Sequence, residues 1–147
     1  MLDKKEFDLW ADGYDKTVGI SDEENTYPFA GYKKVLAFIF QTIMKTENAI
    51  VLDIGFGTGT LTTKLYEQGC SIYGQDLDLR NYLKKNGKII IGDVVFETRK
   101  DLEQCKLKAG DTWDNDEIYF VVEELRKEFP NLSFTRMSDC SGVLILD

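Results

Sequence analysis

The stretch AIVLDIGFGTGTLTTKL, residues Ala49–Leu65, determines the fold expected for this chain. An apolar run ends at Asp53, and glycines follow at positions 55, 57 and 59 before a helix-forming segment begins. A strand, a glycine-rich turn and a helix open many α/β sheets, in which ligands bind beyond the carboxyl ends of the parallel strands. Glycines leave no Cβ atoms in the way, and the helix directs its first N–H groups into the same crevice. The stretch therefore predicts a site for a flat, nucleoside-like ligand.

The rest of the chain alternates helical and strand patterns around this turn, which predicts a single α/β domain. Residues 1–46 form an N-terminal helical segment, and residues 47–147 form a mostly parallel sheet of about five strands with a C-terminal antiparallel hairpin. Helices are predicted over 4–10, 32–44, 58–68, 79–85, 98–108 and 114–129, strands over 49–53, 71–76, 88–93, 133–137 and 143–146, and a polar loop over 12–28.

Composition narrows the classes of function. The 147 residues carry a net charge of −8 and no histidine, which argues against a nucleic-acid partner and excludes His-based triads and His metal sites. The apolar run Val35–Phe40 is too short to span a membrane, and the N-terminus has no secretory pattern, so we expect a cytoplasmic protein. Cys70, Cys105 and Cys140 are widely spaced, which favours reduced thiols and no metal site.

The spacing of the glycines separates several kinds of nucleotide site. A dinucleotide fingerprint needs glycine at its sixth position, where this chain has Thr60, and no P-loop lysine follows. Asp53 would repel a pyrophosphate but suits a ligand with cationic ammonium and sulfonium groups. Asp76, 21 residues after Gly55, is placed to accept hydrogen bonds from a ribose diol. A nicotinamide oxidoreductase remains the weaker alternative.

These segments resemble the class I S-adenosylmethionine-dependent methyltransferases. Their first motif is matched by VLDIGFGTG, and their ribose-binding acid by IYGQDLD. Their fifth strand is matched by LKKNGKIIIGD. The leading segment of small bacterial members of the YrrT-like type resembles FDLWADGYDKTV. The resemblance implies a Rossmann-like fold, S-adenosylmethionine as cofactor and methyl transfer to a small-molecule acceptor. The implied cofactor-binding residues are Asp53, Gly55, Gly57, Gly59, Asp76 and Tyr14, with Trp10 and Tyr27 as further pocket-closing residues and Asp93 facing the substrate.

Several of these residues also have a purely structural interpretation. Asp53 and its glycines are compatible with a tight strand-to-helix turn, and Asp76 and Asp93 with ordinary strand-end acids. Tyr14 and Trp10 are equally suited to packing the N-terminal helix on the sheet. The sequence identifies no catalytic base.

The chain departs from the family pattern after the ribose acid. Roughly 50 to 60 residues, more than one strand-helix-strand unit, are missing from the pattern near Asp78–Leu79. A deletion, a segment that the printed sequence omits, and a shortened relative with a re-paired sheet all fit this pattern. In the last case the strand at Ile89 would lie beside the strand at Val51. A second function follows as an alternative: a non-catalytic protein that binds the cofactor weakly or completes its sheet as a homodimer.

Overall fold

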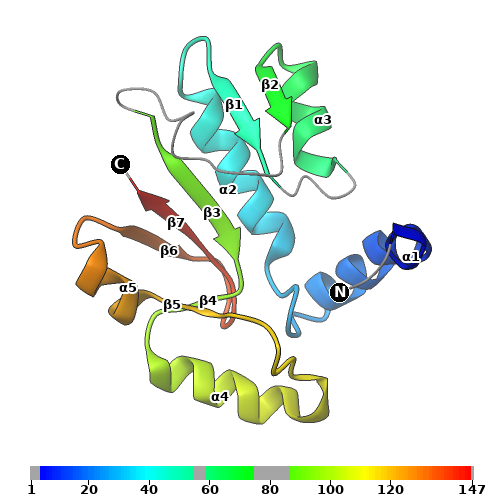
Figure 1. Ribbon diagram of the computed structural model, residues 1–147, viewed down its shortest axis with the longest axis vertical. Helices are drawn as coiled ribbons and strands as arrows, with labels where there is room; N and C mark the ends of the chain where they lie inside the picture. Colours follow the sequence, from blue (N-terminus) through cyan, green and yellow to red (C-terminus); the bar gives the residue numbers. More distant parts are fainter. Residues whose placement is uncertain (1–3, 55–58, 75–86, 147) are drawn as a thin grey trace.

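The computed structural model describes residues 4–54, 59–74 and 87–146 (Figure 1). The predicted site residues Gly55, Gly57 and Asp76, the predicted helix over 79–85 and the expected join at residues 78 and 79 lie outside these ranges. The α-helices of the described chain are α1 (Lys4–Glu23), α2 (Tyr32–Met44), α3 (Thr60–Glu67), α4 (Arg99–Ala109) and α5 (Val122–Glu128). Its strands are β1 (Ile50–Asp53), β2 (Ser71–Gly74), β3 (Ile89–Asp93), β4 (Val95–Phe96), β5 (Phe120–Val121), β6 (Ser133–Arg136) and β7 (Gly142–Leu146).

The α/β class is confirmed, but the described strands form three small sheets instead of one mostly parallel sheet. β1 and β2 pair in parallel, and so do β4 and β5. β3, β7 and β6 form an antiparallel sheet, in which β6 and β7 are the predicted C-terminal hairpin. The expected pairing of Ile89 with Val51 is wrong, because Ile89 pairs with Leu146 on β7 and Val51 with Ile72 on β2.

Helix α2 joins the β1–β2 pair to the antiparallel sheet. Its buried residues Val35 and Ile39 pack on Val143 of β7, in a cluster that also includes Leu61 of α3. Gly92 on β3 allows the close approach, because a Cβ there would lie 2.7 Å from the Cδ1 atom of Ile39. In another apolar cluster of the same sheet, Val122 of α5 packs with Leu144 of β7, and their neighbours in this cluster include Val95, Leu132, Ile91, Phe134 and Leu146.

The N-terminal helix is longer than predicted, and the expected loop over 12–28 is wrong for residues 12–23. Helix α1 continues to Glu23. Val18 is buried, and the Ser21 hydroxyl donates a 2.7 Å hydrogen bond to the carbonyl of Thr26 and accepts a 3.1 Å bond from the N–H of Phe29. These contacts stabilise a polar, glycine-containing segment that has little helical propensity of its own.

The predicted helix over 114–129 is also wrong in its first half. Phe120 and Val121 pair as β5 with β4, and the helix begins at Val122. Ile118, which helical spacing would bury, is 83% exposed. By contrast, α4 has the predicted Thr98 cap, which forms a reciprocal capping box with Asp101.

The turn of the C-terminal hairpin holds the connection between α1 and α2. The hydroxyl groups of Ser138 and Ser141 both donate to the carbonyl of Ala30, over 2.7 and 2.6 Å. Gly31 follows with a φ of 81°, and a Cβ there would lie 2.9 Å from the Ser141 hydroxyl. Since Tyr32 is the next residue, this clamp determines where α2 begins and where the Tyr32 side chain lies.

Candidate functional site

The turn between β1 and α3 lies at the carboxyl end of β1. Asp53 is the last residue of the strand, and its Oδ2 atom accepts a hydrogen bond from the hydroxyl of Thr62 in the first turn of α3. Gly59 caps α3 in the left-handed conformation, with a φ of 78° and no side-chain cap. A side chain at position 59 would be strained in this conformation. Because glycine has no side chain, the N-cap residue itself contributes no side-chain hydrogen bond to the start of α3.

Phenol and carboxyl groups from four elements lie close together near this turn. Burial raises the pKa of Tyr14, and the carboxylates of Asp15 and Asp93 raise it further. Burial also raises the pKa of Tyr32, with Tyr14, Asp15 and Asp53 adding to the shift. We call Tyr14, Asp15, Tyr32, Asp53 and Asp93 the strand-end cluster. Tyr14 and Tyr32 are neutral at physiological pH, as tyrosines with the ordinary pKa of 10.0 also are, and the raised pKa values keep them so at higher pH.

Asp93 ends β3 and brings a second strand end to the cluster. Its Oδ1 atom accepts a 2.6 Å hydrogen bond from the N–H of Val94. Part of the Asp93 residue is exposed to solvent. Crowding by protein atoms nevertheless raises the pKa of its carboxyl group. The hydrogen bond from Val94 lowers this pKa, and the negative charge of Glu117 raises it further. The side chain is thus a partly desolvated acid between α1 and the sheet.

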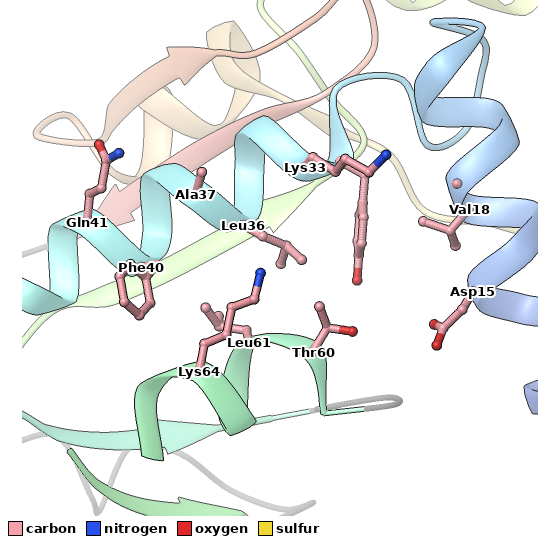
Figure 2. A pocket seen from close by; sticks show the side chains of 12 residues that line it. Asp15, Val18, Lys33, Leu36, Ala37, Phe40, Gln41, Thr60, Leu61 and Lys64 are labelled. Carbon is pink, nitrogen blue, oxygen red and sulfur yellow. The ribbon is translucent and has the colours of Figure 1, made fainter. Parts of the chain in front are cut away.

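A pocket of about 560 Å³ opens beside the cluster, between α1, α2 and α3 (Figure 2). We call it the helix pocket. It shares Asp15 and Tyr32 with the strand-end cluster, so the pocket adjoins the cluster. Its lining residues are Asp15, Val18, Gly19, Tyr32, Lys33, Leu36, Ala37, Phe40, Gln41, Thr60, Leu61 and Lys64.

The structure brings together only some of the residues that the sequence singled out. Asp53 and Gly59 lie at the two ends of the β1–α3 turn, and Tyr14 lies within electrostatic range of Asp93 and Tyr32. Tyr14 also packs edge-on against Phe29, with 5.6 Å between ring centroids, which fits the structural interpretation of this residue. The side chain of Trp10 is not among those described.

Tyr27 does not close the pocket, and this expectation is wrong. Its ring stacks on Trp113 with 4.9 Å between centroids, and its hydroxyl is hydrogen-bonded to that of Tyr119. The residue belongs to the apolar cluster around Phe96 and Trp113, beneath α4. The cis bond to Pro28 follows it.

Sequence reasoning missed Tyr32 and Asp15. Tyr32 looks like an ordinary first residue of an amphipathic helix, although the preceding Gly31 is a signal for an unusual entry geometry. The sequence pattern places Asp15 in a loop, so its alignment with Val18 and Gly19 on one face of α1 is not apparent from it. Within the described ranges, no group of three or more acidic or cysteine side chains is arranged to hold a metal ion, and no helix is long and apolar enough to cross a bilayer.

Comparison with known proteins gives relatives of one kind. An uncharacterized methyltransferase of Geobacillus sp. (strain WCH70) is 37% identical over 101 residues, which are 69% of this chain and 45% of the relative. An uncharacterized methyltransferase of Alkaliphilus oremlandii (strain OhILAs) is 25% identical over 176 residues, covering 84% of this chain and 80% of the relative. The uncharacterized methyltransferase YrrT of Bacillus subtilis (strain 168) is 37% identical over 68 residues, 46% of this chain and 30% of the relative.

The chain belongs to this methyltransferase family. No family model matches it, so its membership depends on these individual relatives. The chain spans less than half the length of the Geobacillus and Bacillus methyltransferases.

Proposed function

We propose that this chain binds S-adenosylmethionine at the β1–α3 turn in a Rossmann-like arrangement and transfers its methyl group to a small-molecule acceptor. The observation that carries the proposal is the combination of methyltransferase relatives with an acid-ended parallel strand and a left-handed, uncapped glycine at the start of the next helix. The bound cofactor would supply an electrophilic methyl carbon on a cationic sulfur.

The residues present fit such a group by charge and by shape. Asp53 carries a carboxylate that is fixed in direction by Thr62 and attracts a cationic ligand. The left-handed Gly59 allows a ligand carboxylate to approach the N-terminus of α3 closely. We include Gly55, Gly57 and Asp76 in the proposed site because of their positions in the sequence motifs.

The strand-end cluster would position the reactants and exclude water. Tyr14 and Tyr32 are protonated at physiological pH, so their hydroxyls can donate hydrogen bonds to a ligand. Asp93 ends β3 beside Tyr14, where its carboxyl group can orient an acceptor or take up a proton. Orientation of this kind is the main contribution that a protein makes to a displacement at carbon.

A second function is favoured by one observation. The alignment with the Alkaliphilus relative spans 176 positions, whereas 84% of 147 residues is about 123, so about 53 positions fall opposite no residue of this chain. This number is close to the shortening inferred near Asp78–Leu79. This shortening supports the second function, in which the chain retains part of the cofactor crevice, binds the cofactor weakly and does not catalyse methyl transfer by itself.

Calorimetric titration with S-adenosylmethionine and S-adenosylhomocysteine tests the proposed binding. We expect saturable heat for both ligands and none for NADH. Saturable binding without methyl transfer to any acceptor tested would support the second function. No heat and no thermal shift at millimolar ligand would contradict cofactor binding altogether.

Two matched glycine variants locate the site within α3. Gly59 and Gly69 lie at opposite ends of this helix with φ values of 78° and 83°, so alanine imposes a similar strain of about 1–2 kcal/mol at either position. We expect Gly59→Ala to weaken cofactor binding by about tenfold or more, while Gly69→Ala leaves it within about twofold at matched stability. Equal losses in both variants would show that strain, and not the site, determines binding.

A further inference from the structure

The helix pocket adjoins the proposed cofactor site. Asp15 and Tyr32 belong to both the pocket and the strand-end cluster, and Thr60, the first residue of α3, lines the pocket directly after Gly59. Figure 2 shows Thr60 and Asp15 on opposite sides of the opening, on α3 and α1. A molecule held in the pocket would therefore extend toward the ligand proposed at the β1–α3 turn.

The walls of the pocket are largely apolar. Leu36 and Phe40 project from α2 toward α3, with Val18 of α1 and Leu61 of α3 opposite them, whereas Ala37 lies at the edge of the pocket, on the side of α2 farther from α3. A volume of about 560 Å³ lies in the range of sites that bury most of a small organic molecule. The pocket suits a ligand whose main body is apolar.

The two lysines that line the pocket, Lys33 and Lys64, differ in their ion-pair partners. The Lys33 ammonium lies 3.6 Å from carboxylate oxygens of both Asp22 and Glu23, which offset its charge. Lys64 has no ion-pair partner among the described side chains, and in Figure 2 it extends from α3 toward α2. Asp15 supplies a negative charge from α1 on the other side. An anionic group would therefore be attracted at Lys64, on the α3 side of the pocket.

We propose that the helix pocket binds the methyl acceptor, and that this acceptor is a small amphipathic molecule with an anionic group. The anion lies at Lys64, the apolar body packs on Leu36 and Phe40, and the opposite end points past Asp15 toward the strand-end cluster. The identification as an acceptor depends on the proposed function, but the preference for an apolar anion depends only on the pocket.

Three ligands with the same tail test this preference by calorimetry on the full chain: octanoate, octylammonium and octanol. We expect octanoate to bind most tightly and octylammonium to bind most weakly. Lys64→Gln should weaken octanoate binding by about fivefold, the effect of one partly exposed ion pair, and leave octanol unchanged. Lys127→Gln on α5 makes the same change in net charge away from the pocket and should leave all three affinities unchanged.

A second pair of variants tests the place of binding without removing any core residue. Ala37 lines the edge of the pocket from an exposed position on α2, so Ala37→Trp should obstruct the pocket and weaken octanoate binding. Lys34→Trp, also exposed on α2 but outside the pocket lining, should bind octanoate like the unmodified chain. Both variants should retain the far-UV circular dichroism of the parent.

The outcomes distinguish this inference from the proposed function. Tighter binding of octylammonium than of octanoate, or octanoate affinities that are equal in the Ala37→Trp and Lys34→Trp variants, would overturn the inference even if S-adenosylmethionine binds. Octanoate binding that depends on Lys64, in a chain that does not bind S-adenosylmethionine, would confirm the anion-binding pocket and contradict the proposed function.

Discussion

The hydroxyl of Thr62 donates a hydrogen bond to Oδ2 of Asp53 and so connects the end of β1 to the first turn of α3. Thr62→Val keeps the shape of the side chain but removes the donor from a half-buried carboxylate. We expect a loss of about 1 kcal/mol in the free energy of unfolding, measured in urea, together with weaker binding of S-adenosylmethionine. Thr63→Val, at the exposed neighbouring position, serves as the control and should change stability by less than about 0.5 kcal/mol. Equal effects at the two positions would contradict a structural role for the Asp53–Thr62 bond.

The raised pKa of Asp93 predicts a pH dependence of stability. Its ordinary value is 3.8, and crowding in the folded state favours the protonated form. The folded chain is therefore stabilised by this group at low pH, and the contribution is lost as pH rises from 3.8 through the higher folded pKa. An asparagine side chain does not titrate and can still accept the bond from Val94, so Asp93→Asn should become more stable relative to the parent as pH rises through this window. Urea unfolding at a series of pH values measures the difference, and a difference that falls with pH would contradict the assignment.

The capping box of α4 provides a prediction away from the proposed site. Thr98 accepts from the N–H of Asp101, and the Asp101 carboxylate accepts from the N–H of Thr98. Thr98→Ala should destabilise the chain by about 1 kcal/mol, whereas Thr98→Ser, which retains the hydroxyl, should not. Neither variant should alter binding of S-adenosylmethionine, since α4 lies apart from the strand-end cluster. A loss of affinity in both variants would show that α4 is coupled to the site.

The three cysteines should differ in reactivity. Cys105 and Cys140 are buried, and burial raises the pKa of Cys105 to about 12, so almost no thiolate forms at mildly alkaline pH. Cys70 is half-buried at the end of α3. We expect iodoacetamide to modify Cys70 first in the native chain and the other two after unfolding, as peptide mass spectrometry can determine. Native labelling of Cys105 at the rate of Cys70 would contradict this arrangement.

The elements that could be predicted from sequence are those whose signals are local. The apolar stripe of α2, the Thr98 cap of α4 and the hairpin of β6 and β7 depend on residues a few positions apart, and each of these predictions is confirmed. The first half of the expected helix over 114–129 is lost to a non-local contact, because Phe120 and Val121 pair with Val95 and Phe96. The extension of α1 has a different cause: the Ser21 hydroxyl near its end is hydrogen-bonded to the backbone of Thr26 and Phe29, in the segment that directly follows the helix.

Of the candidate site, the sequence predicts the strand, turn and helix around Asp53 and Gly59 but not the side chains that surround them. Asp53 and Gly59 are adjacent in sequence to the features that they support, so the motif identified them. Tyr32 and Asp15 enter the site only because the Ser138–Ser141 turn clamps Ala30 and places α1 and α2 around the pocket. Such an arrangement depends on residues more than 100 positions apart and has no local signature.

The central claim is that S-adenosylmethionine binds at the carboxyl end of β1, and amide NMR spectra recorded during a titration with this ligand test it most directly. We expect saturable shifts of the Asp53, Gly59, Thr60 and Tyr32 amides, with the amides of Leu107 on α4 and Arg126 on α5 unchanged. Shifts confined to α4 and α5, or no shifts at millimolar ligand, would contradict it.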